Sequence, residues 1–479
     1  MTTTMNRSHA PAAEARSADR FLDRRPVALA LLVSAQFLVM LDTSIVNVAL
    51  PSIQAELGFG AAAVTWVVNA YVLAFAGLML LSGRASDLFG RRRLFTSGAG
   101  LFTLGTLLAA LAAGPEMLIA GRVVQGVGAA ALSPAAMSLL LSTFPADQRA
   151  RAMGAWGAAS TLGGATGVVI GGLLAGGLGW RFVFLVTVPV SVAAVALAGR
   201  VLEADAPAGR RSLDWVGAVL ATAAVITLVH GAVDAVDHAW TSPRVLGLLS
   251  ASAVLGAAFV VAERRVGDPL VPLGLFGSRM LRRGVVLALL GGSTRASSFV
   301  LVALYLQQVL AMPPQQAGIA MVPTSLTGFV VSLVVLPRAL KVFGPLRTLV
   351  LGLVVLAGGQ LWLAWSPDGL GYVPGILPGL LLVATGVALS FTPTTMVLAS
   401  AAPASHTGLA SGLAAASMQV GAALGTAAFV VVGASSSGAA TGALDGPGFT
   451  AAFTAAAVVA LGTAVLGWRT TTGRTRGAR

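Results

Sequence analysis

The sequence has no cysteine, only four histidines and a single lysine, Lys341. Disulfides, thiolate metal sites and cysteine nucleophiles are therefore excluded. Charged residues are scarce as well: they make up 10% of the 479 residues, whereas hydrophobic residues make up 56%. Because a soluble domain carries roughly 25% charged residues, the composition indicates an all-α polytopic membrane protein that lies in a lipid bilayer.

The same scarcity argues against an enzyme and against a nucleic-acid partner. A membrane enzyme needs a nucleophile with a base, or a cluster of metal ligands, and the scattered acids and four histidines offer neither. We therefore expect no catalytic residue, no metal and no cofactor. The net charge of +13 does not indicate nucleic acid, because the basic residues stand in short clusters between apolar runs. All but one of the 30 basic residues are arginine, which is typical of a GC-rich bacterial genome.

A hydrocarbon core of about 30 Å needs about 20 apolar residues per helix. No short apolar region with a cleavage site precedes the first such segment, so we expect no cleaved signal peptide. The sequence contains fourteen apolar segments, at 27–49, 63–82, 94–113, 117–140, 152–175, 181–199, 214–234, 244–262, 284–310, 317–337, 347–365, 374–399, 408–432 and 450–468.

Basic residues mark one side of the membrane. They fill alternate connections between the segments and both tails, and only Arg122, Arg181, Arg244 and Arg295 lie elsewhere. Cytoplasmic connections carry an excess of arginine and lysine. The charge pattern therefore predicts a multi-pass protein of the cell membrane with both termini in the cytoplasm.

The segments are grouped as six, two and six. A polar linker, EADAPAGRRSLD, follows the sixth segment, and an amphipathic linker that ends in RMLRR follows the eighth. Two six-helix bundles around a central cavity are expected of a transporter with repeated halves. The predicted parts are a cytoplasmic tail 1–26, an N-terminal six-helix bundle 27–199, linkers with an extra two-helix hairpin 200–283, a C-terminal six-helix bundle 284–468 and a cytoplasmic tail 469–479.

Asp42 is the one acid in the first segment. At 1.5 Å per residue it lies roughly 12 Å from the outer end, where a charge that faces lipid is unfavourable. We therefore predict that Asp42 faces a cavity or a partner and serves as a proton or cation site. The alternative is a carboxylate that is only paired for packing, or one that reaches the headgroups.

The connection GRASDLFGRRR follows the second segment. Gly83 and Gly90 are expected to allow a tight reversal of the chain there. Asp87 is an acid in a positively charged loop, which favours a latch in which it pairs with arginines or with a helix N-terminus. Arg91 and Arg92 are either part of that latch or simple topology signals.

Arg122 stands inside the fourth segment, near its outer end. A buried arginine stays charged and needs an acidic or dipolar partner. Gln125 lies three residues further on the same helix face, and Asp42 lies at a similar depth. We predict a direct or water-bridged contact between Arg122 and Asp42, with a purely structural ion pair as the alternative.

The fifth segment is rich in glycine. Gly163, Gly167 and Gly171 recur every four residues and form one smooth face, and Gly154 and Gly172 lie on the same helix. A face of this kind permits close helix packing. The packing partner is either another helix of the same bundle or the other bundle.

Taken together, these motifs resemble the major facilitator superfamily, specifically its fourteen-helix drug:proton antiporter branch. The signatures of the first helix, the following loop, the fourth helix and the fifth helix all have counterparts, and the extra hairpin at 214–262 is also typical of that branch. The matching positions are 41–51, 83–93, Arg122, Gln125, Gly126, Gly128, Gly154, Gly163, Gly167, Gly171 and Gly172.

The resemblance implies proton-coupled efflux of a hydrophobic drug, antibiotic or natural product by alternating access, driven by the proton gradient without a cofactor. Asp42 would be the proton site and Arg122 the residue that modulates it. Asp87 would belong to the conformational latch, and 163–172 to the hinge and inter-helix seal. We expect a monomer. The alternative is an importer or facilitator of the same fold for a small organic solute.

Two positions depart from the family pattern. Val168 replaces the usual proline after the third glycine of the fifth helix, so the kink of that pattern loses its usual cause. Leu88 replaces a basic residue that often follows the acid of the loop.

Arg295 is the unusual residue among the substrate-cavity candidates, because it lies near mid-membrane in the ninth segment. An unpaired positive charge disfavours a cationic substrate, which favours a neutral or anionic natural product. The alternative is that Arg295 pairs with Asp42 across the cavity. The candidates, each of which can equally be a packing residue, are Asn69, Gln125, Arg295, Tyr305, Gln308, Gln360 and Gln419.

Overall fold

The apolar segments form helices, because a chain in lipid must satisfy its backbone hydrogen bonds internally. Within the described residues every regular element is helical, and each of the fourteen predicted segments overlaps a helix. Within the described ranges, twelve helical stretches are long and apolar enough to cross a membrane. The computed structural model describes residues 25–60, 63–203, 213–238, 240–366, 371–403, 406–437 and 444–476.

In chain order, the described residues form an N-terminal group of helices, a two-helix hairpin and a C-terminal group of helices. The N-terminal group comprises α2 (Arg25–Leu57), α3 (Trp66–Phe89), α4 (Arg91–Ala110), α5 (Pro115–Thr143), α6 (Ala146–Gly177), α7 (Arg181–Leu185) and α8 (Val188–Val201). The hairpin is α9 (Trp215–Asp237) and α10 (Pro243–Glu263), followed by the short η1 (Leu273–Gly277). The C-terminal group comprises α11 (Arg279–Gln308), α12 (Pro314–Ala320), α13 (Val322–Val330), η2 (Val331–Val335), α14 (Leu336–Ala364), η3 (Tyr372–Ile376), α15 (Leu377–Ala401), α16 (Thr407–Ser436) and α17 (Gly446–Arg476).

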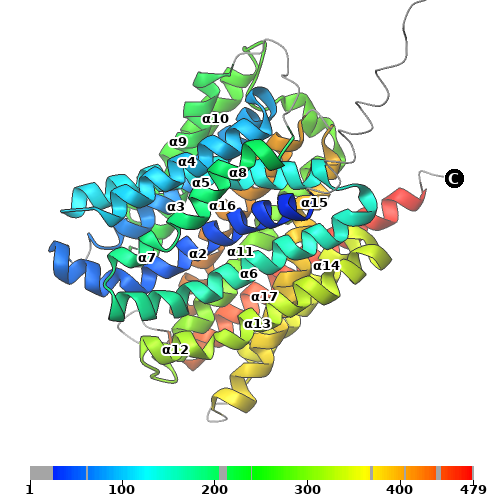
Figure 1. The fold of residues 1–479 in the computed structure, drawn as a ribbon. Coiled ribbons are helices and arrows are strands. Elements are labelled where there is room, and N and C mark those ends of the chain that lie inside the picture. The colour runs from blue at the N-terminus through cyan, green and yellow to red at the C-terminus, as the bar shows by residue number, and fades with distance from the viewer. Residues whose placement is uncertain are drawn as a thin grey trace, which may run out of the picture.

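The hairpin lies at the edge of the bundle (Figure 1). Ser252 of α10 donates to the carbonyl oxygen of Ala224 in α9 at 2.8 Å. A Cβ atom at Gly77 of α3 would lie only 2.6 Å from Cγ1 of Ile226 in α9. Of the two helices of the hairpin, α9 therefore packs against the main bundle.

One stretch of 49 residues, Gln316–Ala364, is too long for a single crossing. A straight helix of that length would extend about 74 Å, against a hydrocarbon core of about 30 Å. Gly344 interrupts the helical backbone with φ of 74°, and Pro345 follows it. The stretch therefore consists of two helical arms that meet at Gly344.

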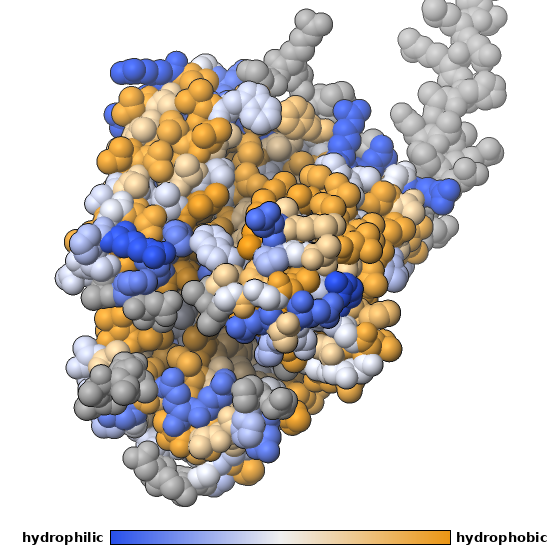
Figure 2. Space-filling model, turned by 90° about the vertical axis from the view of Figure 1, so that its left-hand side faces the viewer, coloured by the Kyte–Doolittle hydropathy of each residue, from blue (hydrophilic) through white to orange (hydrophobic). Residues whose placement is uncertain are grey.

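The outside of the bundle is apolar. Leu173, Val219, Val254, Val342 and Val458 are each more than 60% exposed. Figure 2, viewed from the left-hand side of Figure 1, shows hydrophilic residues gathered in separate patches among hydrophobic ones. Large apolar surfaces of this kind are unfavourable in water and match the solvent properties of lipid tails.

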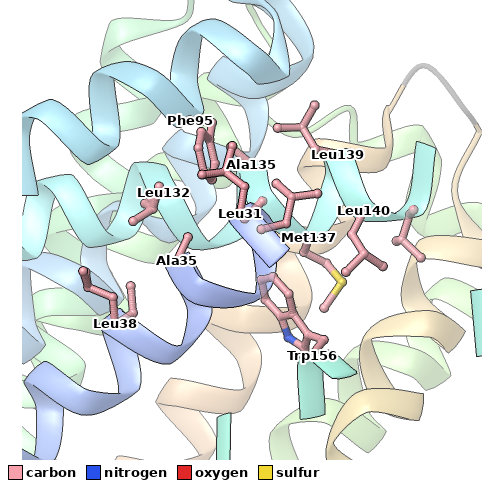
Figure 3. Close-up of a cluster of buried hydrophobic side chains, with 14 of the residues drawn as sticks. Leu31, Ala35, Leu38, Phe95, Leu132, Ala135, Met137, Leu139, Leu140 and Trp156 are labelled. Carbon is pink, nitrogen blue, oxygen red and sulfur yellow. The ribbon is translucent and has the colours of Figure 1, made fainter. Parts of the chain in front are cut away.

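The N-terminal group packs around α5, as the core cluster in Figure 3 shows. Small residues let the helices approach, since a Cβ atom at Gly128 of α5 would lie 2.3 Å from the backbone nitrogen of Phe102 in α4. The labelled core residues are Leu31, Ala35 and Leu38 of α2, Phe95 of α4, Leu132, Ala135, Met137, Leu139 and Leu140 of α5, and Trp156 of α6.

The start of α2 and the end of α17 lie at the same end of the bundle (Figure 1). We call it the basic end, because a pocket of about 1130 Å³ opens there between the two groups, lined by Arg91, Arg149, Arg151, Arg338 and Lys341 together with Asp147.

The connection between α3 and α4 is shorter than predicted. Helix α3 continues to Phe89 and α4 begins at Arg91, so Gly90 is the one residue between them. Gly90 has φ of 96°, a conformation that favours glycine. Gly90 therefore makes the reversal, whereas Gly83 lies inside α3, which corrects its predicted role in the turn.

Candidate functional site

Asp42 of α2 and Arg122 and Gln125 of α5 form one buried hydrogen-bonded group. Arg122 Nη1 donates to Asp42 Oδ2 at 2.7 Å and to Gln125 Oε1 at 2.6 Å. Gln125 Nε2 donates to Asp42 Oδ1 at 2.7 Å. All three side chains are at most 1% exposed. The predicted contact between Asp42 and Arg122 is therefore confirmed, and it is direct.

Two further helices complete this group. Thr106 Oγ1 of α4 accepts from Gln125 Nε2 at 2.9 Å. The carbonyl oxygen of Val67 in α3 accepts from Arg122 Nε at 2.9 Å. The ring centroid of Tyr71, also in α3, lies 4.3 Å from Arg122 Cζ, which is a cation–π contact. Residues of α2, α3, α4 and α5 thus hold this group of side chains in place.

The hydrogen-bond donors around Asp42 match the ionised form of its carboxyl group. Thr106 donates its hydroxyl proton to the carbonyl oxygen of Phe102 at 2.8 Å, so it can only accept from Gln125. Gln125 must then present its amide nitrogen to Asp42, while Arg122 has donors only. Both oxygens of Asp42 therefore receive hydrogen bonds, as a carboxylate requires. A proton on either oxygen would remove the negative charge that Arg122 pairs with.

Asp87 joins two helices that are far apart in the sequence. It lies near the end of α3, where its Oδ1 accepts from the backbone nitrogen of Gly408 and its Oδ2 from that of Leu409, each at 2.8 Å. These N–H groups belong to the first turn of α16, where the helix dipole attracts an anion. Of the two partners that the sequence allowed, the structure shows the helix N-terminus.

Three glycines permit this contact at the basic end. A Cβ atom at Gly83 would lie 2.6 Å from the carbonyl oxygen of Gly408, and one at Gly412 would lie 2.6 Å from that of Met79. The backbones of α3 and α16 therefore touch, because there is no room for other side chains between them. Asp87 links the two helices there by hydrogen bonds.

The arginines after Gly90 have different surroundings. Arg91 lines the pocket at the basic end. Arg92 Nη1 donates to the carbonyl oxygen of Leu202 at 3.2 Å, just after α8. Arg92 thus binds within the N-terminal group, and Arg91 faces the gap between the two groups.

The glycine face of α6 packs against α2. Cβ atoms at Gly163, Gly167 and Gly171 would lie 2.6 Å from Phe37 O, 1.9 Å from Ser44 Oγ and 2.8 Å from Ile45 O. The packing partner of this face is thus a helix of its own group.

Gly154 and Gly172 lie outside this close contact. A Cβ atom at Gly172 would be 3.9 Å from Val48 Cγ1, which is ordinary contact, and one at Gly154 would be 2.6 Å from the carbonyl oxygen of Ser332 in η2. Helix α6 therefore meets the C-terminal group at Gly154. Its helical backbone continues through Val168.

A cavity of about 390 Å³ lies between α6 and the C-terminal group. Its wall includes Met40 of α2 and Ser160 of α6 on one side, and Phe299, Ser332 and Thr392 on the other. None of the described residues that line it is charged. Pockets for drug-sized ligands span roughly 300 to 1,000 Å³ and are mostly apolar, so this cavity suits such a molecule.

Residues 32–426 match the family model described as Major Facilitator Superfamily. The chain belongs to the major facilitator superfamily. It is therefore a multi-pass membrane transporter and not an enzyme.

Several known proteins are similar to this superfamily member. The chain is 39% identical over 409 residues to the cephamycin export protein CmcT of Amycolatopsis lactamdurans, an alignment that covers 85% of this chain and 84% of that protein. It is 36% identical over 471 residues to the puromycin resistance protein pur8 of Streptomyces alboniger, covering 95% and 93%. Its fold is similar to that of the human organic anion transporter MFSD10, with a TM-score of 0.67, 15% identity and coverage of 92% and 98%.

The cavity candidates of this superfamily member lie in several places. Gln125 belongs to the Asp42 group. Gln308 Oε1 accepts from the backbone nitrogen of Leu444 at 3.1 Å, and the ring of Tyr305 meets that of Phe449 edge-on, with centroids 5.1 Å apart. Gln308 and Tyr305 thus connect the end of α11 to α17 and to the segment that precedes α17.

The remaining neutral candidates are also placed by helix packing. Gln360 Nε2 donates to Ser298 Oγ at 2.8 Å and thereby links α14 to α11. Asn69 and Gln419 are half-buried. None of the seven candidates is among the described residues that line the 390 Å³ cavity.

Arg295 does not pair with Asp42, so that alternative is wrong. The carboxylate of Asp42 is bound by Arg122 instead. The terminal nitrogens of Arg295, Nη1 and Nη2, are buried and have no hydrogen-bond partner among the described residues. The guanidinium group lies back over Gly291, where a Cβ atom would be 2.7 Å from Nη1.

Sequence reasoning missed several members of the site. Thr106 and the Val67 carbonyl lie in apolar runs and carry no signal of their own. Gly408 and Gly412 carried a usable sequence signal, since glycines four residues apart permit close helix contact in membranes.

Proposed function

We propose that the protein exports a hydrophobic drug, antibiotic or natural product across the cytoplasmic membrane, driven by protons and working by alternating access. Two similar proteins are named for cephamycin export and puromycin resistance, and both align over more than four-fifths of this chain. The uncharged cavity between the two groups supports a hydrophobic cargo.

The same proposal includes fourteen membrane crossings. The twelve apolar stretches include Gln316–Ala364, whose two arms count as two crossings. Helix α4, with 20 residues, begins with three arginines that lower its hydropathy and is the remaining crossing. The bundles would then be 27–199 and 284–468, with linkers and the hairpin at 200–283. The tails 1–26 and 469–479 would lie in the cytoplasm, on the side of the basic end, and the working unit would be a monomer.

Asp42 is the proposed proton site, and its hydrogen bonds are the observation that carries the proposal. Its carboxylate is fully buried and bound by Arg122 and Gln125. Because protonation would remove the charge that Arg122 pairs with, it would weaken this charge-assisted hydrogen bond and loosen α2 from α5. Uptake of a proton at Asp42 is thus coupled to a change in helix packing.

Closure at the basic end would alternate with this change. Asp87 links α3 of one group to α16 of the other, and the glycine contact beneath it holds the two backbones together. Opening towards the cytoplasm requires this contact to break. Gly163, Gly167 and Gly171 would keep α6 sealed against α2 while the groups move.

Inverted membrane vesicles with an acidified lumen test the proposal. Addition of puromycin, a cephamycin or one of a panel of dyes should release protons from wild-type vesicles. Asp42→Asn should abolish the release, whereas Asp147→Asn, an exposed acid at the basic end, should retain it. If Asp42→Asn couples substrate to protons as the wild type does, Asp42 is not the proton site. Substrate movement without proton movement in the wild type would indicate a facilitator instead.

A further inference from the structure

The cavity between α6 and the C-terminal group has an uncharged wall with a few hydroxyl groups. Three of the six serine and threonine hydroxyls in this wall have partners nearby in the chain. Ser160 Oγ donates to Trp156 O at 3.0 Å, Thr161 Oγ1 donates to Ala158 O at 3.0 Å, and Thr324 Oγ1 donates to Met321 O. Hydroxyl groups that donate in this way to a backbone carbonyl cannot also donate to a ligand.

Two hydroxyls in the same wall differ. Ser332 and Thr392 are at most 1% exposed, and within the described part of the chain neither Ser332 Oγ nor Thr392 Oγ1 has a hydrogen-bond partner. Buried hydroxyls without a partner are rare, because burial removes the hydrogen bonds that water supplied. Both residues line the cavity, so a molecule in the cavity is the partner within reach.

Gly157 of α6 packs directly against these two hydroxyls. A Cβ atom at Gly157 would lie 3.0 Å from Thr392 Oγ1 and 3.1 Å from Ser332 Oγ. The two oxygens therefore lie within about 6 Å of each other, on either side of a glycine that has no room for a side chain. Ser332 belongs to η2, a five-residue π-helix, and such segments frequently occur at functional sites.

We propose that Ser332 and Thr392 form a polar subsite that binds a hydrogen-bond acceptor, such as a carbonyl oxygen, of a neutral and otherwise hydrophobic substrate. The inference rests on the proposed efflux function and names the chemical class of its cargo.

The uncharged wall explains why the substrate is neutral. A charged group moved from water into an apolar site needs a partner of opposite charge, and the described residues that line the cavity supply none. A carbonyl oxygen needs only a donor, which either hydroxyl provides. Such a site rejects an analogue without the acceptor, because the buried hydroxyls then stay unpaired.

Equilibrium binding to the purified full chain in nanodiscs tests this subsite. The probes are chloramphenicol and progesterone, which are neutral and carry carbonyl groups, with ethidium as the cation and deoxycholate as the anion. The double variant Ser332→Ala/Thr392→Val should raise the Kd for the neutral probes about tenfold. Gly157→Ala should also weaken binding, because its methyl group covers both hydroxyls.

The matched control is Thr394→Val, which removes a buried hydroxyl on the same helix as Thr392 that donates to its own helix and does not line the cavity. It should leave the Kd unchanged, and thermal unfolding without ligand should show that every variant folds. Equal affinity in wild type and double variant, binding of the charged probes alone, or no binding of either neutral probe would each overturn the subsite.

Binding is measured without a proton gradient, so the two proposals fail separately. Loss of proton coupling in vesicles with retained neutral-probe binding would contradict the efflux mechanism and leave the subsite standing.

Discussion

Arg122 in the N-terminal group and Arg295 in the C-terminal group are both buried, at 1% and 4% exposed, yet their surroundings are opposite. Arg122 binds a carboxylate, an amide oxygen and a backbone carbonyl, and lies against an aromatic ring. The terminal nitrogens of Arg295 have no hydrogen-bond partner among the described residues.

The surroundings of Arg122 and Arg295 show two different situations of a buried charge. In the N-terminal group the charges of Asp42 and Arg122 cancel, and every displacement of one leaves the other unpaired. That makes the pair sensitive to a single proton. Among the described residues no carboxylate pairs with the guanidinium of Arg295 in the C-terminal group. The proposed proton site therefore lies in the N-terminal group alone, and the described residues that line the cavity between the groups carry no charge.

Removal of Arg122 should have the largest effect. Arg122→Met leaves the buried carboxylate of Asp42 without its cation, and breaking a buried pair from one side costs about 3–5 kcal/mol. Thermal unfolding of the purified protein should show this loss. The double variant Asp42→Asn/Arg122→Met should recover part of it, because no charge is then unpaired. If the double variant is no more stable than Arg122→Met, the pairing does not explain the loss.

Asp87→Asn should weaken the contact between the two groups. The amide keeps one acceptor oxygen but turns N–H groups towards a backbone donor, which costs about 2 kcal/mol. Because the described chain has no cysteine, a single cysteine introduced at the buried position Ser86 (Ser86→Cys) reports on this contact. We expect it to react with a thiol reagent about 30-fold faster when Asp87→Asn is also present than when it is not. Asp147→Asn is the control. An unchanged labelling rate in Asp87→Asn would show that Asp87 does not hold the basic end closed.

The glycine face inside the N-terminal group should be less sensitive. Gly167→Ala places a methyl group 1.9 Å from Ser44 Oγ, which can rotate away, and 2.9 Å from Leu41 O, which cannot. We expect a loss of about 1.5 kcal/mol in unfolding free energy. Gly164→Ala on the same helix has nothing within 4 Å of the added atom and should be neutral. Equal losses in both variants would mean that the contact with α2 does not cause the loss.

Arg295→Met should have the smallest effect on stability, and it sharpens the comparison with Arg122→Met most directly. The substitution removes a buried charge whose terminal nitrogens lack partners, so we expect a change within about 1 kcal/mol or a gain. Thermal unfolding of the two methionine variants side by side is the measurement. A loss as large as that of Arg122→Met would reveal a partner of Arg295 and end the distinction between the two arginines.

The helices could be predicted from the sequence because lipid leaves the backbone few alternatives. Each predicted segment overlaps a helix, but the boundary at Gly83 was wrong because α3 continues six residues beyond it to Phe89. Polar and charged residues such as Arg84 and Asp87 look like a loop by composition. Contact with α16 keeps them helical, and only the packed structure contains that contact.

The candidate site could be predicted in part. The contact between Asp42 and Arg122 followed from equal depth, since two opposite charges in an apolar medium must find each other. The direction of Arg295 and the partner of Asp87 did not follow. Depth places a side chain along the membrane normal, and it does not say which neighbouring helix the side chain faces.

The sequence by itself determined that this chain crosses a membrane many times, to which superfamily it belongs, and which acid must be sheltered from lipid. Hydrophobic length and the placement of charge are local properties, and the bilayer acts on each segment separately. The tertiary structure alone decided that Thr106 completes the Asp42 group, that the backbone nitrogen of Gly408 donates to Asp87, and that Ser332 and Thr392 both lie beside Gly157. Those contacts depend on how helices rotate and approach one another, which is set by the packing of the whole bundle.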